Sequence, residues 1–72
     1  MNNETLKQAV RQWAQKIGAR KAAQKMLAAG LSYGLTHKLV HGVYDSSLSF
    51  DRANELIRLM KEDGFLKEEV AS

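Results

Sequence analysis

The sequence predicts an all-α protein with four to five short helices. In successive segments the apolar residues recur every three or four positions, the spacing that places them on one face of a helix. No segment shows the alternation of apolar and polar residues that is typical of a half-buried strand, and the chain contains no proline. Glycines and short polar residues divide the chain into segments of helical length.

The first helix is expected over about Glu4–Ile17. Its apolar stripe consists of Leu6, Ala9, Val10, Trp13, Ala14 and Ile17. Asn2 or Asn3 can accept hydrogen bonds from the amides of the first turn, and Gly18 allows the chain to leave the helix. Because Trp13 lies in the middle of the stripe, it is expected in the core.

Two shorter helices are expected next, over about Arg20–Ala29 and about Tyr33–His41. The apolar side of the earlier one is expected to carry Ala23, Met26 and Leu27. Gly30 ends this helix, Ser32 is a suitable N-cap for the next one, and Gly42 ends that helix in turn.

A fourth helix is expected after the loop of residues 43–48, with Ser49 as its N-cap and Gly64 at its end. Its apolar stripe consists of Ala53, Leu56, Ile57 and Met60. Residues 65–72 are expected to form a short fifth helix around Leu66 and Val70, or a tail.

The composition argues against several classes of protein. The 72-residue chain has no cysteine, and its two histidines cannot complete a structural zinc site, so no disulfide, metal or other cofactor is expected. It also lacks a glycine-rich phosphate loop and paired carboxylates flanked by apolar sequence, so we do not expect an enzyme. No apolar run approaches 18 residues and no signal peptide is recognisable, which predicts a cytoplasmic protein without a membrane partner.

Charge is distributed unevenly along the chain. Residues 1–42 contain seven Lys or Arg and one acid, a net charge of +6, whereas residues 43–72 contain four Lys or Arg and seven acids, a net charge of −3. The acids near the end are expected to form a solubilising surface, namely Glu62, Asp63, Glu68 and Glu69. A basic half predicts a face that meets an anion, and nucleic acid is the most obvious one, although acidic proteins and membrane surfaces attract the same charge.

The stretch from Leu27 to Gly42 has the pattern of a helix-turn-helix. Gly30 provides the tight turn between two helices, and Leu31 directly after it can fill the angle between them. Ser32 starts the next helix, and Leu39 with Val40 can anchor that helix to the core.

From Gly18 to Gly64 the sequence resembles the helix-turn-helix of the phage Cro and CI repressor superfamily. Two positions depart from that family, which usually has a small residue in place of Met26 and Val or Ile in place of Thr36. The resemblance implies a lambda-repressor-like fold, with a single helix-turn-helix domain over residues 1–64 followed by residues 65–72. It also implies that the helix from Tyr33 to His41 is a recognition helix that enters the major groove of DNA.

The resemblance then predicts five residues on the side that reads bases, namely Ser32, Tyr33, Gly34, His37 and Lys38. Lys38 can donate to guanine O6 or N7 or to a phosphate, and Tyr33 can stack on a sugar or a thymine methyl. Gly34 costs about 1 kcal/mol relative to alanine inside a helix, which is reasonable where the backbone must approach DNA closely. Two other interpretations stay open, because Tyr33 can cover the edge of the core and Gly34 can permit tight helix packing.

Phosphate contacts are predicted mainly at the start of the second helix, where the amides of the first turn also attract anions. The side chains expected to make them are Arg20, Lys21, Gln24, Lys25 and His41. An ordinary solvated basic face is the alternative. His37 and His41 have the spacing seen in metal-binding helices, but no third ligand is near them in the sequence, so no metal is expected.

We therefore expect a sequence-specific transcriptional regulator, a Cro-like repressor that binds a double-stranded DNA operator as a homodimer without a small-molecule ligand. The residues considered for the dimer surface are Val43, Tyr44 and Leu48, or Phe65, Leu66 and Val70. Two other classes stay open: a small helical protein-interaction module, such as an inhibitor or adaptor, and a nonspecific or architectural DNA-binding accessory factor.

Overall fold

Four α-helices follow one another along residues 2–66, the part of the chain that the computed structural model describes, and these residues contain no strand. The helices are α1 (Asn3–Ile17), α2 (Ala19–Ala28), α3 (Tyr33–His41) and α4 (Phe50–Glu62). The predicted all-α class is confirmed, and the predicted boundaries of the first three helices differ from these by at most one residue. Phe65 and Leu66 are not helical, and the rest of the expected fifth helix lies outside the described residues.

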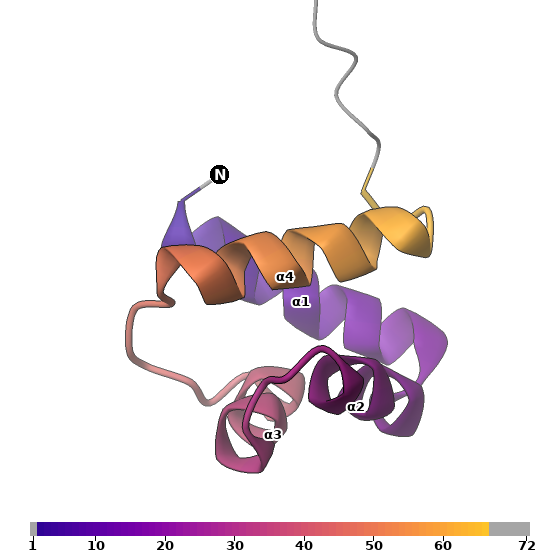
Figure 1. Cartoon of the computed structure of the whole chain (residues 1–72), viewed down its shortest axis with the longest axis horizontal. Helices are drawn as coiled ribbons and strands as arrows, with labels where there is room; N and C mark the ends of the chain where they lie inside the picture. Colours follow the sequence, from indigo (N-terminus) through magenta and orange to yellow (C-terminus); the bar gives the residue numbers. More distant parts are fainter. Residues whose placement is uncertain (1, 67–72) are drawn as a thin grey trace, which may run out of the picture.

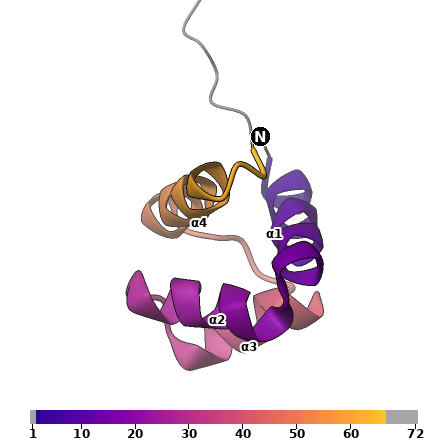
Figure 2. The same cartoon turned by 90° about the vertical axis from the view of Figure 1, so that its right-hand side faces the viewer.

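The helices occupy two sides of the molecule. In Figures 1 and 2, α1 and α4 lie on one side, and α2 and α3 lie together on the other. α1 and α4 run across the view of Figure 1, whereas α2 runs across the view of Figure 2. The α2–α3 side can therefore meet a partner that does not touch α4.

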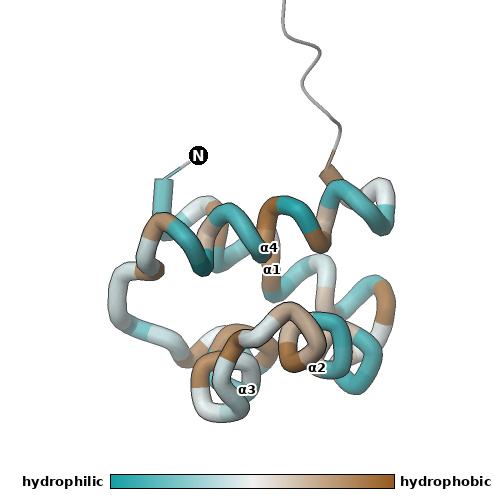
Figure 3. The backbone as a smooth tube through the Cα atoms, in the orientation of Figure 1, coloured by the Kyte–Doolittle hydropathy of each residue, from teal (hydrophilic) through white to brown (hydrophobic). Residues whose placement is uncertain are grey.

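All four helices contribute to one core. Hydrophobic and hydrophilic residues alternate every few positions along the chain in Figure 3, as an amphipathic helix requires. The buried apolar residues are Leu6, Val10, Trp13, Ala14, Ala22, Met26, Leu31, Leu35, Leu39, Leu48, Leu56, Leu59 and Met60. Trp13 is completely buried, as predicted.

The prediction for the apolar side of α2 is partly wrong. Ala22 and Met26 face the core, whereas Ala23 is only half-buried and Leu27 is exposed. Ala22 and Met26 are four residues apart and so share one face of the helix, and Leu27 is turned about 100° away from Met26.

Helix starts agree with the predicted caps. The side chain of Asn2 accepts a hydrogen bond from the Thr5 amide at 2.8 Å, and Ser49 accepts one from the Arg52 amide at 3.3 Å. Ser32 caps α3 in the same way, through the Leu35 amide at 3.2 Å. α2 differs, because Gly18 precedes it and no side chain caps its first turn.

The turn between α2 and α3 is built on Gly30, whose φ of 94° is a conformation that favours glycine. The N–H of Gly30 donates to the carbonyl oxygen of Leu27 at 3.0 Å, and the N–H of Leu31 donates to that of Met26 at 3.1 Å. These two bonds form the Schellman arrangement that ends many helices. Leu31 is buried beneath the turn, so the local roles predicted for Gly30 and Leu31 are confirmed.

Within residues 2–66, no helix has both the length and the apolar character needed to cross a membrane.

Candidate nucleic-acid interface

One side of α3 is exposed and carries three rings in a row. Leu35, Thr36 and Leu39 face the core, whereas Tyr33 is 73% exposed. The ring centroids of Tyr33 and His37 are 6.3 Å apart in a stacked arrangement, and those of His37 and His41 are 4.4 Å apart. Tyr33, His37 and His41, four residues apart along the helix, therefore form a continuous outward-facing group, the ring row.

The other residues predicted to read bases are exposed as well, namely Ser32, Gly34 and Lys38. A Cβ atom added to Gly34 would meet no heavy atom within 4 Å, apart from the backbone of its own helix and chain neighbours. The interpretation that Gly34 permits tight helix packing is therefore wrong for the described residues. The interpretation of Tyr33 as an edge of the core is wrong too, because most of its side chain faces solvent.

The α2–α3 side carries only positive formal charge. Residues 19–42 contain no acid, and Arg20, Lys21 and Lys38 are exposed. The ion pairs found among residues 2–66 involve none of these three side chains. The acids of the described residues belong to other segments, at Glu4, Asp45, Asp51, Glu55, Glu62 and Asp63, and Asp51 and Glu55 line a pocket next to the Gly30 turn.

A groove of about 380 Å³ joins the ring row to the start of α2. Its α2 wall consists of Ala19, Arg20, Ala23 and Leu27, and its α3 wall of Tyr33, Thr36, His37, Val40 and His41. The fold thus brings Arg20 and the ring row to one surface. Lys21 and Gln24 are exposed on the same helix but do not line the groove.

Leu27 is the residue of this surface that the sequence prediction missed. It is 41% exposed and lines the groove, although its apolar side chain suggested the core. Adjacency to Met26 was no signal, because adjacent helical residues such as Trp13 and Ala14 are both buried in the core.

Lys25 was predicted to contact phosphate, but its ammonium group is engaged with α4. Its Nζ lies 3.1 Å from Oδ1 of Asp63, and the indole N–H of Trp13 donates to Oδ2 of the same carboxylate at 2.8 Å. Partial burial raises the pKa of Asp63, but the hydrogen bond from Trp13 and the ion pair with Lys25 outweigh it, so the pKa lies below its ordinary value of 3.8. Asp63 therefore links α1, α2 and the end of α4, and is more than the solubilising acid expected from the sequence.

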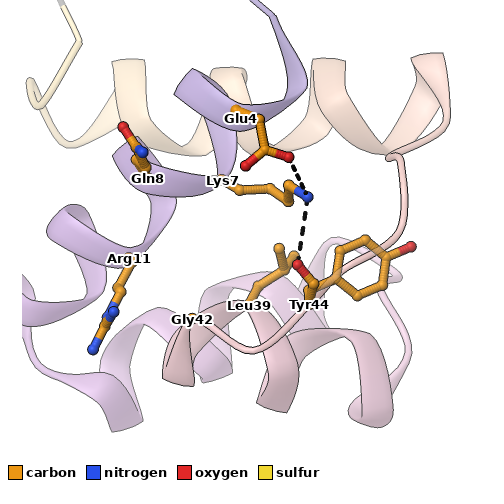
Figure 4. A pocket seen from close by; sticks show the side chains of 7 residues that line it. All are labelled: Glu4, Lys7, Gln8, Arg11, Leu39, Gly42 and Tyr44. Carbon is orange, nitrogen blue, oxygen red and sulfur yellow. Dashed lines mark hydrogen bonds and ion pairs between the residues drawn. The ribbon is translucent and has the colours of Figure 1, made fainter.

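Two cations of α1 flank the end of α3 (Figure 4). The Lys7 ammonium lies 3.1 Å from Glu4 and donates to the carbonyl oxygens of Tyr44 at 3.4 Å and Ser46 at 3.3 Å, so it holds the loop after α3 against α1. The Arg11 side chain lies beside Gly42, where an added Cβ atom would be 2.7 Å from Arg11 Cδ. Arg11 therefore brings a cation to the C-terminal end of α3, where the helix dipole favours one.

The residues considered for a dimer surface separate into two groups. Leu48 is buried and belongs to the core, so its assignment to a dimer surface is wrong for this chain. Tyr44, Phe65 and Leu66 are half-buried against the core, and Val70 lies outside the described residues. Val43 is 62% exposed, and Phe50, which the sequence prediction did not include, is 80% exposed.

Comparisons with known proteins identify no family or structural neighbour. A scan against protein-family models, a search of curated proteins and a search of solved structures found no match to this chain. Among the described residues, no three His, Asp or Glu side chains gather as possible metal ligands.

Proposed function

We propose that this protein is a sequence-specific DNA-binding transcriptional regulator of the Cro-like kind, in which α2, the Gly30 turn and α3 form a lambda-repressor-like helix-turn-helix. The observation that carries the proposal is the α2–α3 side, where exposed rings and cations occur together and residues 19–42 contain no acid. DNA binding is driven largely by neutralisation of phosphates, which such a surface favours.

In this proposal α3 lies in the major groove with its N-terminal residues nearest the bases. Ser32, Tyr33 and His37 present hydrogen-bonding groups, and Lys38 is the candidate for guanine O6 or N7. The open space beside Gly34 supports a close approach of the α3 backbone to a base edge.

Phosphates are then held around the reading helix. Arg20, Lys21 and Gln24 act together with the amides of the first turn of α2, which no side chain caps. His41 and Arg11 add donors near the end of α3. We leave Lys25 out of this set, because its charge is paired with Asp63.

We further propose that the protein binds its operator as a homodimer through Val43 and Phe50. Both side chains are large, apolar and exposed, and they flank the loop that Lys7 and Asn3 hold against α1. Pairing two recognition helices about 34 Å apart provides the base contacts that one short helix cannot supply.

Selection of bound sites from a random duplex pool, followed by titration of those sites at two salt concentrations, tests the function. A recovered near-palindromic motif that binds far more tightly than random duplex is the expected result. Binding with a steep salt dependence but no motif would identify an architectural accessory factor instead, and no binding at low salt would favour a protein-interaction module.

A matched pair of lysine variants makes this test specific to α3. Lys38→Ala should weaken binding to the selected site by roughly 1–3 kcal/mol, because it removes a base contact. Lys61→Ala removes an exposed lysine of the same charge from α4 and should leave affinity nearly unchanged. Unchanged affinity of a folded Lys38→Ala protein would remove Lys38 from the interface.

A further inference from the structure

The end of the α2–α3 groove next to the Gly30 turn is apolar and open. Leu27 from α2 and Tyr33 from α3 both line the groove there, and they are 41% and 73% exposed. Both residues lie within three positions of Gly30, so the turn at Gly30 places them on the same side of the fold. A leucine side chain has no hydrogen-bonding group, so an apolar group of a partner is the contact that suits Leu27.

The charges around the groove indicate which class of molecule carries that apolar group. Arg20 lies at the other end of the groove, His37 and His41 line its α3 wall, and neither α2 nor α3 contains an acid. A partner that is apolar where it meets Leu27 and anionic around it fits these features. In the major groove of DNA the thymine 5-methyl group is the one apolar feature on the base edges, and phosphates flank it.

We propose that Leu27 and Tyr33 form a thymine-reading pocket, which receives the 5-methyl group of a thymine when α3 lies in the major groove. This inference rests on the proposed function and adds a base preference to it. Leu27 supplies the apolar contact from α2, while the Tyr33 ring covers the methyl group from α3. The groove, at about 380 Å³, has ample room for a methyl group.

The test removes only the methyl group. Sites selected by the wild-type protein from a random duplex pool are resynthesised with deoxyuridine in place of thymidine, one position at a time, and affinities are measured by fluorescence anisotropy. At one position in each half-site, the uracil duplex should bind the wild-type protein about three- to fivefold more weakly, as expected for the loss of one buried methyl group.

Variants then assign the effect to the pocket. Leu27→Ala should bind the thymine and uracil duplexes equally, and Tyr33→Phe, which keeps the ring, should retain the wild-type preference. Lys61→Ala truncates an exposed side chain of α4, outside the groove, and should also retain it. Circular dichroism establishes that each variant is folded.

The possible outcomes separate this pocket from DNA binding itself. A selected site that tolerates uracil at every position, or a preference that persists in Leu27→Ala, would overturn the pocket and leave the regulator intact. Failure to recover any selected site would overturn both proposals.

Discussion

Thr36 is a buried polar residue whose hydroxyl has no partner. It is 1% exposed, and its Oγ1 makes no hydrogen bond among the described residues. Removing a hydroxyl from water without a new hydrogen bond is unfavourable by about 1–3 kcal/mol.

We therefore expect Thr36→Val to raise the free energy of unfolding by about 1 kcal/mol, because valine keeps the shape and removes the unpaired hydroxyl. Urea denaturation measures the change. Thr36→Ser keeps the hydroxyl and loses the methyl group, so it should be less stable than wild type. A valine variant no more stable than wild type would mean that the hydroxyl has a partner in solution.

Gly34 lies inside α3 and lowers the stability of this helix, which Ser32 caps at its start. Its backbone is helical and an added Cβ atom would meet open space, so no feature of the described residues requires glycine there. Glycine is nevertheless less favourable than alanine in a helix. The proposed DNA contact provides a reason for it, because a base edge can approach the bare backbone.

Gly34→Ala should therefore make the protein more stable and a weaker DNA binder. We expect the free energy of unfolding to rise by about 1 kcal/mol and the affinity for the selected site to fall. Thermal denaturation and anisotropy titration on the same preparation measure both effects. Gly30→Ala is the contrasting variant, since the positive φ of Gly30 predicts a loss of about 1–2 kcal/mol in stability. A Gly34→Ala protein with full affinity would contradict the close approach.

Prediction from sequence succeeded where the signals are local. The N-cap roles of Ser32 and Ser49 and the turn at Gly30 depend on a few neighbouring residues, and all three were predicted correctly.

It failed where the outcome depends on distant segments. The alanine-rich α2 offers several apolar stripes, and only packing against α1, α3 and α4 selects Ala22 over Leu27 for the core. Leu48 lies in a loop without periodicity, and its amide is held by Asn3, 45 residues away. The contact of Asp63 with Trp13 likewise spans 50 residues.

Across the molecule, most of the unbalanced positive charge lies on one of the two sides, the side formed by α2 and α3. The basic α2–α3 side lies opposite α4, where three acids balance three basic residues and the acid Asp63 follows the last turn. The two sides are joined by the ion pair of Lys25 with Asp63, so one acid of the α4 segment neutralises a cation of α2. DNA should therefore approach in one orientation, with α4 turned away from the phosphates.

Asp63→Asn should destabilise the protein by about 1 kcal/mol near neutral pH, because the Trp13 and Lys25 partners lose a charged acceptor. The pKa of Asp63 is lowered in the folded protein, so its contribution is fully present above the unfolded-chain value near 3.8 and is lost as pH falls through the folded-state pKa. The difference in stability between wild type and variant should begin to shrink as pH falls past the unfolded-chain value and should vanish only below the folded-state pKa of Asp63. A difference that is independent of pH would assign the effect to packing.

If the protein dimerises as proposed, a variant with a disrupted dimer surface should have half the mass of the wild type in solution. Phe50→Asp places a charge at one of the two exposed apolar side chains proposed for the dimer, and the aspartate suits the first turn of α4, so the fold should persist. Sedimentation equilibrium should show a dimer for wild type and a monomer for the variant, with weaker binding to a two-half-site operator. Leu27→Asp is the control for an exposed apolar position elsewhere and should remain dimeric. A wild-type protein that is monomeric both alone and on DNA would refute the dimer.

Trp13 also gives the chain an internal optical reporter. It is the sole tryptophan of the sequence, it is completely buried, and its indole N–H is held by a carboxylate at the end of α4. Detachment of α4 would admit water to the indole and shift its fluorescence to longer wavelengths. Because Trp13 does not line the α2–α3 groove, emission from the unlabelled protein can follow the opening of its core separately from events on that groove.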